Sequence, residues 1–440
     1  MKLLYITPYI PYPLDSGGNQ AFYMMADHIR KQHDLSVLLY VHNSKERKYI
    51  EALQQIWDDV TFYLFEPKVV EDKVTASPYE HMSWLDRKAC EFFDYLHHSM
   101  FRKIERRKCK YETQGVSNDG HDFDLVRARS TLFVGAGDLS DQFCQYVQEV
   151  SSKGFDIVQT EFYDYLPLVY LLPSHVKKVF VHHELRFVRN NNELSLFKKI
   201  LPTDRLLYES QKAHEIACLS VYDAVITLTK IDYGILSDYI PKSRIYVSPA
   251  ITQAVSFKPQ PFKPATELVF IGSGDHFPNY DAMVWFCNEI VPIIKEKADV
   301  MPKINIIGNW NKDQEIGLKK AAPDVIFPGF VDDLQAFVNG KISIVPIRIG
   351  SGMRMKILDS IFAAAPLITT SKGCEGLPMV NEENCLIADD AESFAEAVVR
   401  IVVDKNMQEQ LAVTALHSKT NMLNDYELLE RRQAVYAKLI

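Results

Sequence analysis

The chain has 440 residues and a formal net charge of −8; 47% of the residues are hydrophobic and 24% are charged. This is the composition of a globular protein in water, long enough for two domains with separate cores. The negative balance excludes a general nucleic-acid binder, and no apolar run reaches the roughly 18–20 residues of a membrane-spanning helix. The seven cysteines lack paired spacing, which predicts reduced thiols, no metal site and a cytoplasmic protein.

Short apolar runs alternate with amphipathic stretches along most of the chain, and this pattern predicts an α/β fold of parallel sheets with helices on both faces. In the first half, strands are expected at residues 2–7, 35–41, 60–65, 155–160, 177–182, 224–228 and 245–248. In the second half, they are expected at residues 268–272, 303–308, 325–328, 342–346, 366–370 and 385–388. Helices fit between most of these strands, for example over residues 279–297 and 332–339.

A proline-rich connector separates the two sets of strands. Residues 256–265 contain three prolines, a composition typical of a stiff linker between domains. We therefore expect one doubly wound domain over residues 1–255 and a second over 266–415, with a ligand cleft where the carboxyl ends of their strands face each other. Residues 416–440 carry apolar side chains at helical spacing and predict a final helix.

Residues 75–122 interrupt the alternation and predict an inserted helical segment. Within it, residues 87–110 carry eight Lys or Arg against three acidic residues, interleaved with aromatic side chains. A basic, aromatic amphipathic helix can bind the surface of an anionic membrane, which would place the protein peripherally on the inner membrane face. A surface helix that packs its apolar side on the protein and solvates its charges explains the same pattern, so both interpretations stay open.

The run 346–359 contains the strongest local signal in the chain. A glycine-flanked turn, residues 350–352, follows an apolar strand and precedes a helix, so free backbone N–H groups and the helix dipole create an anion site. Arg354 and Lys356 add two cations that can neutralise a diphosphate, and Asp359 can accept hydrogen bonds from a ribose. These features suit a nucleotide diphosphate. A tight turn with solvated basic residues is the alternative interpretation.

Six short motifs follow one another along nearly the whole chain, at residues 6–18, 155–161, 270–286, 327–333, 350–359 and 363–370. In this order and spacing they resemble the glycosyltransferases of family 4, the group 1 nucleotide-sugar transferases. The resemblance implies the GT-B fold, with two Rossmann-like doubly wound domains facing across a cleft. It also implies that the C-terminal helix crosses back onto the N-terminal domain.

The resemblance further implies a reaction. A sugar would move, with retention at the anomeric carbon, from a nucleotide diphosphate donor on the C-terminal domain to a glycan or lipid-linked acceptor on the N-terminal domain, as in surface polysaccharide biosynthesis. No metal or other cofactor is implied, because protein cations and backbone donors hold the diphosphate. Two alternatives stay open: a non-catalytic partner subunit that binds a nucleotide sugar or glycan, and a sugar-nucleotide epimerase.

The donor motif departs from the family in two places. The family commonly has two glutamates separated by seven residues, and here these positions are Ser351 and Asp359, so Ser351 supplies no carboxylate to the transferred sugar. The family's Arg and Lys after the first strand of the donor domain are also absent, so the diphosphate charge is left to other cations. The expected donor contacts are Gly272, Gly274, Arg348, Gly350, Ser351, Gly352, Met353, Arg354, Lys356, Asp359 and Glu375.

Glu375 is expected in a loop after a donor-domain strand, where it can bind sugar hydroxyls and partly replace the carboxylate missing at Ser351. A solvated loop acid is an equal alternative. Gly17 and Gly18 open a helix whose free N–H groups can face the donor phosphates or the acceptor. A plain strand-to-helix turn explains the same two glycines.

Adjacent histidines, His182 and His183, end a predicted strand on the cleft side. The resemblance puts a histidine near the sugar and the acceptor, and it favours His183, because the Glu-Leu-Arg that follows matches the residues after the family histidine. An imidazole can donate to a sugar hydroxyl or share a proton near neutral pH. Neighbouring residues of an extended backbone point to opposite faces, so only one of the pair is expected to reach the site. Two structural histidines are the alternative.

Overall fold

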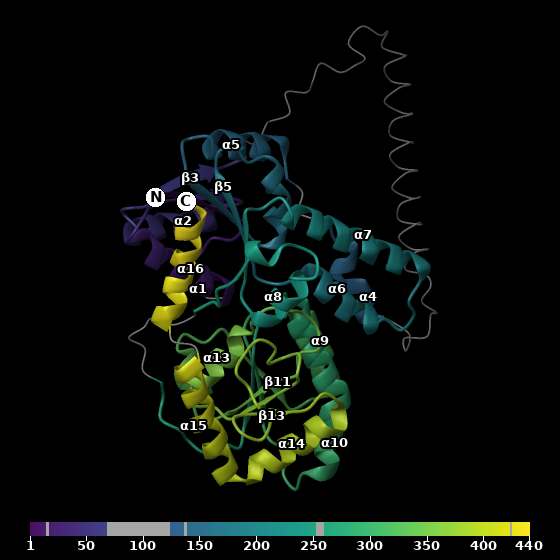
Figure 1. Cartoon of the computed structure of the whole chain (residues 1–440). Helices are drawn as coiled ribbons and strands as arrows, with labels where there is room; N and C mark the ends of the chain where they lie inside the picture. Colours follow the sequence, from purple (N-terminus) through teal and green to yellow (C-terminus); the bar gives the residue numbers. More distant parts are fainter. Residues whose placement is uncertain (15–16, 68–123, 136–138, 252–258, 423–424) are drawn as a thin grey trace, which may run out of the picture. The chain divides into compact units, whose positions relative to one another are not determined.

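The structure, a computed structural model, describes residues 1–14, 17–67, 124–135, 139–251, 259–422 and 425–440 (Figure 1). The chain forms two compact units, residues 1–66 with 129–440, and residues 67–128. Of the smaller unit, the structure describes Pro67 and the start of a short helix, α4 (Leu125–Arg129). The expected insertion at 75–122, with its basic stretch 87–110, lies outside the described residues, and so do residues 256–258 of the expected linker.

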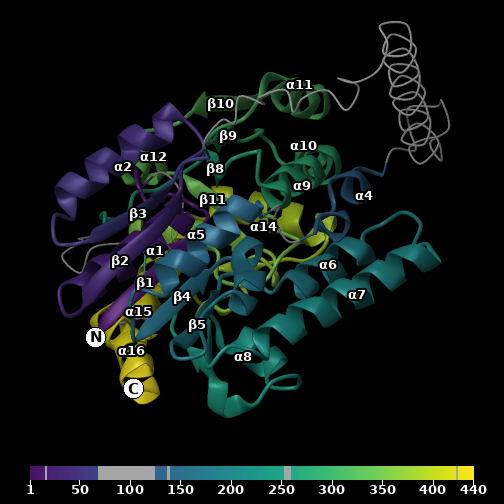
Figure 2. The same ribbon diagram turned by 90° about the horizontal axis from the view of Figure 1, so that it is seen from above.

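The N-terminal half forms a parallel sheet with strand order β3-β2-β1-β4-β5-β6-β7 in the part of the chain that the structure describes. Figure 2 shows β3, β2, β1, β4 and β5 side by side in this order. The strands are β1 (Lys2–Thr7), β2 (Asp34–Tyr40), β3 (Thr61–Phe65), β4 (Ile157–Glu161), β5 (Lys177–His182), β6 (Ala224–Thr227) and β7 (Ile245–Val247). Because the chain leaves β1 toward one edge and resumes at β4 on its other side, the switch point lies between β1 and β4.

The C-terminal half repeats this plan in a second parallel sheet, with order β10-β9-β8-β11-β12-β13. Its strands are β8 (Leu268–Ile271), β9 (Ile304–Ile307), β10 (Val325–Gly329), β11 (Ile342–Val345), β12 (Leu367–Thr369) and β13 (Leu386–Ile387). The switch point lies between β8 and β11, which pair with Leu268 beside Ile342. The structure has a strand at each position expected from the sequence, because strands buried on both faces read as continuous apolar runs.

Helices cover these sheets, and among the described residues none is long and apolar enough to cross a membrane. Besides α4, the α-helices are α1 (Gly17–Arg30), α2 (Ser44–Ile56), α5 (Asp141–Ser151), α6 (Arg186–Ser195), α7 (Pro202–Leu219), α8 (Lys230–Leu236), α9 (Phe277–Trp285), α10 (Val291–Lys297), α11 (Lys312–Ala321), α12 (Leu334–Val338), α13 (Met355–Phe362), α14 (Ala391–Val403), α15 (Lys405–Met422) and α16 (Asp425–Leu439). Short 3₁₀ helices are η1 (Thr131–Phe133), η2 (Tyr163–Tyr170) and η3 (Lys242–Arg244). A π-helical turn, Phe286–Ile290, joins α9 to α10, so these elements together occupy the helix expected at 279–297.

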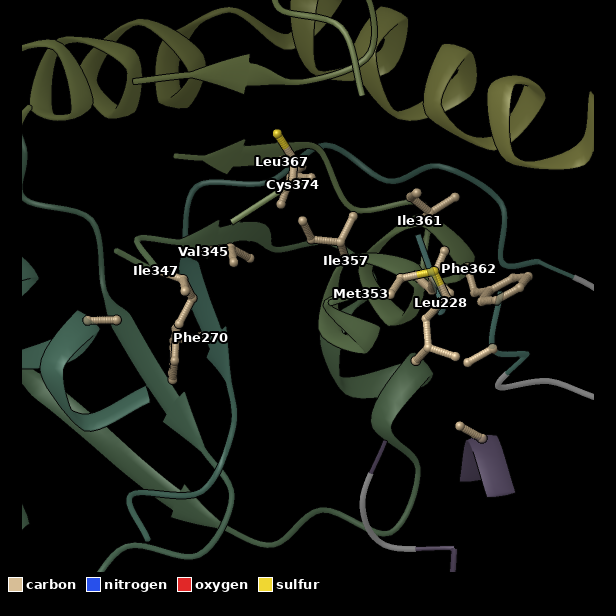
Figure 3. Packing of buried hydrophobic residues seen from close by; sticks show 14 of the residues in the cluster. Leu228, Phe270, Val345, Ile347, Met353, Ile357, Ile361, Phe362, Leu367 and Cys374 are labelled. Carbon is tan, nitrogen blue, oxygen red and sulfur yellow. The ribbon is translucent and has the colours of Figure 1, made fainter. Parts of the chain in front are cut away.

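The helix after β11, α13, is held by an apolar stripe. Ile357 and Ile361 lie four residues apart on α13 and therefore share one face, and Met353 lies just before the helix. Figure 3 shows these three side chains within a cluster of buried residues that also contains Leu228 of the N-terminal half. Met353 is only 8% exposed and is part of the core cluster, and its expected donor contact stays a prediction. Its burial fixes the start of α13.

The end of the chain returns to the N-terminal sheet, as the resemblance implies. Helix α15 runs through Met422, and α16 lies next to α1 (Figure 1). Glu430 of α16 pairs with His28 of α1 at 3.2 Å, and Tyr436 bonds to Tyr5 of β1 at 2.6 Å. The helix that was expected as one piece over 416–440 is therefore shared between α15 and α16, and α16 makes the crossing contacts.

Candidate donor and catalytic site

The turn between β11 and α13 carries two glycines that the backbone requires. Gly350 has φ +122° and Gly352 has φ +75°, conformations that side chains disfavour. A Cβ atom on Gly352 would also lie 2.1 Å from the carbonyl oxygen of His183. Glycine at position 352 therefore lets the turn of the C-terminal domain touch the backbone of the candidate catalytic histidine.

Ser351 fastens this turn to the N-terminal domain. Its hydroxyl accepts a hydrogen bond from the N–H of Leu185 at 2.6 Å, and the N–H of Ser351 donates to Glu184 Oε1 at 3.3 Å. The N–H of Gly350 donates to Asn192 Oδ1 at 3.2 Å. Ser351 is 4% exposed. The position where the resemblance expects a sugar-binding carboxylate is thus used for a contact between the two domains.

Arg354 stands immediately before α13 with one side of its guanidinium free. Nη1 donates to the carbonyl oxygen of Ser351 and, at 3.0 Å, to that of Gly352. Nη2 is buried and has no hydrogen-bond partner among the described residues. Because a buried unpaired donor is costly, this nitrogen fits a site for an anionic ligand.

Lys356 lies in the first turn of α13 and reaches back to the loop after β8. Its Nζ donates to Asn279 Oδ1 at 2.5 Å and lies 4.3 Å from the centre of the Phe270 ring. Gly272 permits this approach, because a Cβ there would lie 2.6 Å from Asn279 Nδ2 and 3.0 Å from Lys356 Nζ. Two loops at the switch point of the second sheet therefore meet around this ammonium group.

Lys356 and Asp359 have strongly shifted pKa values. Burial, followed by the positive charge of Arg354, lowers the pKa of Lys356 to about 7. Burial raises the pKa of Asp359 to about 7, although Lys356 offsets part of this effect. Both groups are therefore poised to change charge near neutral pH when a charged ligand arrives.

The two histidines point to opposite faces of the first sheet, as their adjacent positions predict. His182 is buried, and its Nε2 lies 2.7 Å from Glu215 Oε1. Glu215 also accepts the N–H groups of Arg186 and Phe187 at the start of α6, so His182 belongs to a structural cap. The side chain of His183 is 15% exposed and pairs through Nε2 with Glu161 Oε2 at 2.7 Å.

Phe162 connects His183 to the first helix. The two rings are stacked, with centroids 4.0 Å apart and an interplanar angle of 4°. Phe162 has φ +65°, a strained conformation for a bulky residue, of the kind that functional sites retain. A Cβ on Gly18 would lie 3.8 Å from this ring, and one on Gly17 would lie 2.7 Å from Met355. The N-termini of α1 and α13 therefore meet beside His183.

Three expected donor residues have other partners. The guanidinium of Arg348 pairs with Asp281 at 2.8 and 3.2 Å and lies over Trp285 at 5.0 Å. The side chain of Gln314 packs against Gly274, and a Cβ on Gly274 would lie only 2.4 Å from it. Because Arg348 is committed to an ion pair within its own domain, the free cationic charge at the turn comes from Arg354 and Lys356.

The third residue, Glu375, pairs with Lys372 at 2.8 and 3.0 Å. Its charge still acts on Arg354, so it lies at the border of the site.

Glu184 is a site residue that the sequence did not single out. Its carboxylate accepts from the N–H of Ser351 and from Arg189 Nη1 at 3.1 Å. Burial alone would raise its pKa, but the charges of Arg189, His276 and further cations lower the pKa of Glu184 to about 2. An ionised carboxylate from the N-terminal domain therefore lies beside the turn, directly after His183, and that adjacency is the only sequence signal that marks it.

His276 and Asn279 were also missed, and both come from the loop that begins α9. Asn279 holds Lys356, and its Nδ2 donates to the carbonyl oxygen of Ser273 at 2.8 Å. His276 acts electrostatically on Glu184. Among the described residues, no group of three His, Cys, Asp or Glu side chains could hold a metal ion.

Part of the chain matches a known family. Residues 265–404 match the family described as "Glycosyl transferases group 1". A protein of Klebsiella pneumoniae described as "Uncharacterized 44.6 kDa protein in cps region" is 29% identical over 157 residues, which are 34% of this chain and 40% of that protein. The chain thus matches less than half the length of this relative.

Solved structures resemble the chain over its whole length. A mutant of S. aureus TarM, in complex with Fondaparinux, alpha-GlcNAc-glycerol and UDP, has a TM-score of 0.64 at 10% identity, covering 99% of this chain and 100% of TarM. WaaG, a glycosyltransferase involved in lipopolysaccharide biosynthesis, has a TM-score of 0.56 at 11% identity, covering 99% of each chain. At these identities the likeness shows the fold.

Two doubly wound domains, joined through the turn after β11 and by a returning C-terminal helix, define a protein of the GT-B class. Within that class, residues 265–404, which include most of the C-terminal domain, match the group 1 glycosyltransferases, also called family 4. The fold class expected from the sequence is confirmed, and the family match over residues 265–404 agrees with the resemblance.

Proposed function

We propose that this chain is a retaining glycosyltransferase that moves a sugar from a nucleotide diphosphate donor to a hydroxyl of a glycan or lipid-linked acceptor in surface polysaccharide biosynthesis. The match of residues 265–404 to the group 1 glycosyltransferases supports the reaction class. The cps region in the name of the Klebsiella pneumoniae relative supports the polysaccharide role, and the complex of TarM with UDP supports a nucleotide diphosphate donor.

One observation carries the proposal: two cations and two helix N-termini meet beside His183. Arg354 offers the buried Nη2, Lys356 lies in the first turn of α13, and Gly352 touches the backbone of His183. A diphosphate bound here would lie at the positive end of α13. The sugar attached to it would then extend toward the N-terminal domain.

In the proposed reaction, the bond between the anomeric carbon and the diphosphate oxygen breaks, and a bond from the acceptor oxygen forms. The electron pair goes to the leaving diphosphate, so negative charge builds there, and the proton of the acceptor hydroxyl passes to the diphosphate oxygen that leaves. Arg354 and Lys356 then stabilise the transition state more than the bound donor, which is what accelerates the step. His183 is placed to hold a sugar or acceptor hydroxyl, with its other ring nitrogen fixed by Glu161.

A hollow on the N-terminal domain supports a saccharide acceptor. It has a volume of about 200 Å³ and is lined by Tyr9, Tyr12 and Tyr49 among its residues. Tyr9 packs edge-on against Phe162 with ring centroids 4.7 Å apart, and Phe162 stacks on His183. Aromatic faces with nearby polar groups are suited to sugar rings.

Peripheral binding to an anionic membrane rests on residues 87–110, outside the described part, and stays a prediction.

The test is a panel of nucleotide sugars, incubated with the purified protein with and without candidate acceptor glycans, while release of the nucleoside diphosphate is measured. We expect release from a small number of donors, increased by acceptor. Conversion of one nucleotide sugar into another without acceptor would identify an epimerase. Tight binding of a nucleotide sugar with no release under any condition would identify a binding subunit and overturn the proposal.

A further inference from the structure

A continuous chain of hydrogen bonds leads from His183 to the C-terminal helix. His183 Nε2 lies 2.7 Å from Glu161 Oε2, and the other oxygen of Glu161 accepts from Gln159 Nε2 at 2.6 Å. Gln159 Oε1 accepts from the hydroxyl of Tyr436 at 2.5 Å. The hydroxyl of Tyr5 lies 2.6 Å from that of Tyr436. Three strands and α16 thus contribute to a single network.

The sheet explains why these side chains meet. Gln159 and Glu161 are two residues apart on β4 and therefore share a face. Gln159 is paired with Tyr5 on β1, and Glu161 is paired with Val181 on β5, two residues before His183. The network therefore follows one face of the sheet, and α16 covers that face with Tyr436.

The chemistry of the groups sets the direction of every bond. A carboxylate only accepts, so Glu161 takes one hydrogen from the ring of His183 and one from the amide nitrogen of Gln159. The amide oxygen of Gln159 must then face Tyr436, whose hydroxyl donates to it. Tyr436 has used its hydrogen, so Tyr5 donates to Tyr436. The ring nitrogen of His183 that carries the hydrogen is therefore Nε2.

The inner members of this network are closed to water. Gln159 and Tyr436 are 0% exposed, Tyr5 is 1% exposed and Glu161 is 3% exposed. Burial raises the pKa of Tyr436 to about 12, although the charge of Arg432 offsets part of this effect, so the hydroxyl keeps its hydrogen throughout the neutral range. In such an environment a lost partner is not replaced by solvent, and the remaining groups must rearrange.

We propose that Tyr436 is a positioning residue for the transfer reaction, acting through Gln159 and Glu161 on the ring of His183. This inference rests on the proposed function, in which His183 faces the reacting sugar. Tyr436 fixes the amide of Gln159, the amide fixes the carboxylate of Glu161, and the carboxylate fixes the tautomer and tilt of the imidazole. The ring of His183 is therefore held in one orientation only when α16 packs on the N-terminal domain.

The test compares Tyr436→Phe with Tyr222→Phe. Tyr222 is equally buried at 0% exposure, but its hydroxyl bonds to Thr160 and to the carbonyl oxygen of Leu166, apart from the network. Both variants lose one buried hydroxyl and should lose similar thermal stability. We expect kcat to fall about 10- to 100-fold in Tyr436→Phe, as for a modest misplacement of a reacting group, with donor KM little changed. Tyr222→Phe should keep its kcat.

A second measurement does not depend on catalysis. In protein with ¹⁵N-labelled histidine, the Nε2–H signal of His183, assigned by its loss in His183→Gln, should be slow to exchange with water. Tyr436→Phe should shift it and speed its exchange, whereas Tyr222→Phe should leave it unchanged. Tyr5→Phe removes only the last donor and should have a smaller effect than Tyr436→Phe.

The two readouts separate the inference from the proposed function. An unchanged His183 signal in a folded Tyr436→Phe protein, or an equal loss of kcat in Tyr222→Phe, would overturn the positioning role. A wild-type protein that transfers no sugar, but whose His183 signal responds to Tyr436→Phe as expected, would refute the transferase proposal while the hydrogen-bond network stands.

Discussion

At the scale of single residues, Lys356 links donor binding to pH. Its pKa is lowered to about 7 by burial and by Arg354, so above pH 7 the free protein loses the charge that a diphosphate needs. Binding then requires uptake of a proton, and the dissociation constant for UDP should rise by up to about tenfold per pH unit above pH 7. Below pH 7 Lys356 is already charged, and its contribution becomes flat.

Asp359 complicates this measurement, because its pKa is raised to about 7 and its ionised form would favour the ribose as pH rises. We therefore expect the dissociation constant for UDP to depend on pH most clearly in the Asp359→Asn variant. In the double variant Asp359→Asn/Lys356→Arg this pH dependence should disappear, since a guanidinium stays charged. Calorimetric titration with UDP between pH 6 and pH 9 measures both. A UDP affinity independent of pH in Asp359→Asn would refute the role of Lys356.

Gly352 offers a second test at this scale. Gly352→Ala would put a Cβ 2.1 Å from the carbonyl oxygen of His183, so the turn must move away from the histidine. We expect sugar transfer to fall by about 100-fold, the effect of a misplacement near 1 Å. Gly154→Ala is the matched control, because Gly154 also has positive φ, +81°, but no neighbour within 4 Å of the added Cβ.

Each glycine variant should lose about 1–2 kcal/mol of stability through backbone strain, and thermal melts measure this part. The rate of sugar transfer should therefore differ between the two variants, whereas the loss of stability from backbone strain should be similar in both. Equal activity in folded Gly352→Ala and Gly154→Ala would show that the contact with His183 has no part in the reaction.

At the scale of elements, we expect the two histidines at the end of β5 to have different roles, His182 in stability and His183 in the reaction. His183→Ala should lower kcat by about 10²–10⁴-fold, the usual contribution of an acid, base or positioning group, with a smaller loss of stability than His182→Ala, because the side chain of His183 is partly exposed and water can take its place. His182→Ala removes the buried partner of Glu215, the carboxylate that caps α6. It should cost about 1–3 kcal/mol of stability. Steady-state kinetics and thermal melts that gave the reverse pattern would exchange the two assignments.

The elements show where sequence patterns are sufficient. Each strand was predictable because its apolar run is dictated by burial on both faces of a parallel sheet. The turn at residues 350–352 was predictable because its glycines, its cations and its place before a helix are neighbours in the chain. The end of α15 was not, since the apolar spacing at residues 416–440 continues without a visible stop before α16 begins.

Tertiary pairing explains what the sequence could not supply. Arg348 looks like a donor ligand within its motif, but Asp281 and Trp285 engage it from a distant helix. Ser351 looks like a lost function, but it joins the turn to Leu185. Such pairs depend on which strands become neighbours, and no local pattern encodes that.

At the scale of the whole molecule, the donor turn of one domain is built into the acceptor side of the other. Gly352 reaches His183, Ser351 reaches Leu185, and α16 returns to β1 and β4 through Tyr436. This arrangement places the free cations of the C-terminal domain and the histidine of the N-terminal domain around one point. We therefore propose that Arg354 and Lys356 together stabilise the leaving group.

The most direct test of this assignment is the rate of nucleoside diphosphate release by the double variant Arg354→Ala/Lys356→Ala, with Arg348→Ala as control. The double variant should melt like the wild type, because both residues are only partly buried as a whole, but lose about 10³-fold or more in kcat/KM as electrostatic stabilisation disappears. Arg348→Ala should instead lose stability, since it leaves Asp281 buried and unpaired, and should retain transfer. A folded double variant that releases nucleoside diphosphate at nearly the wild-type rate would contradict the account.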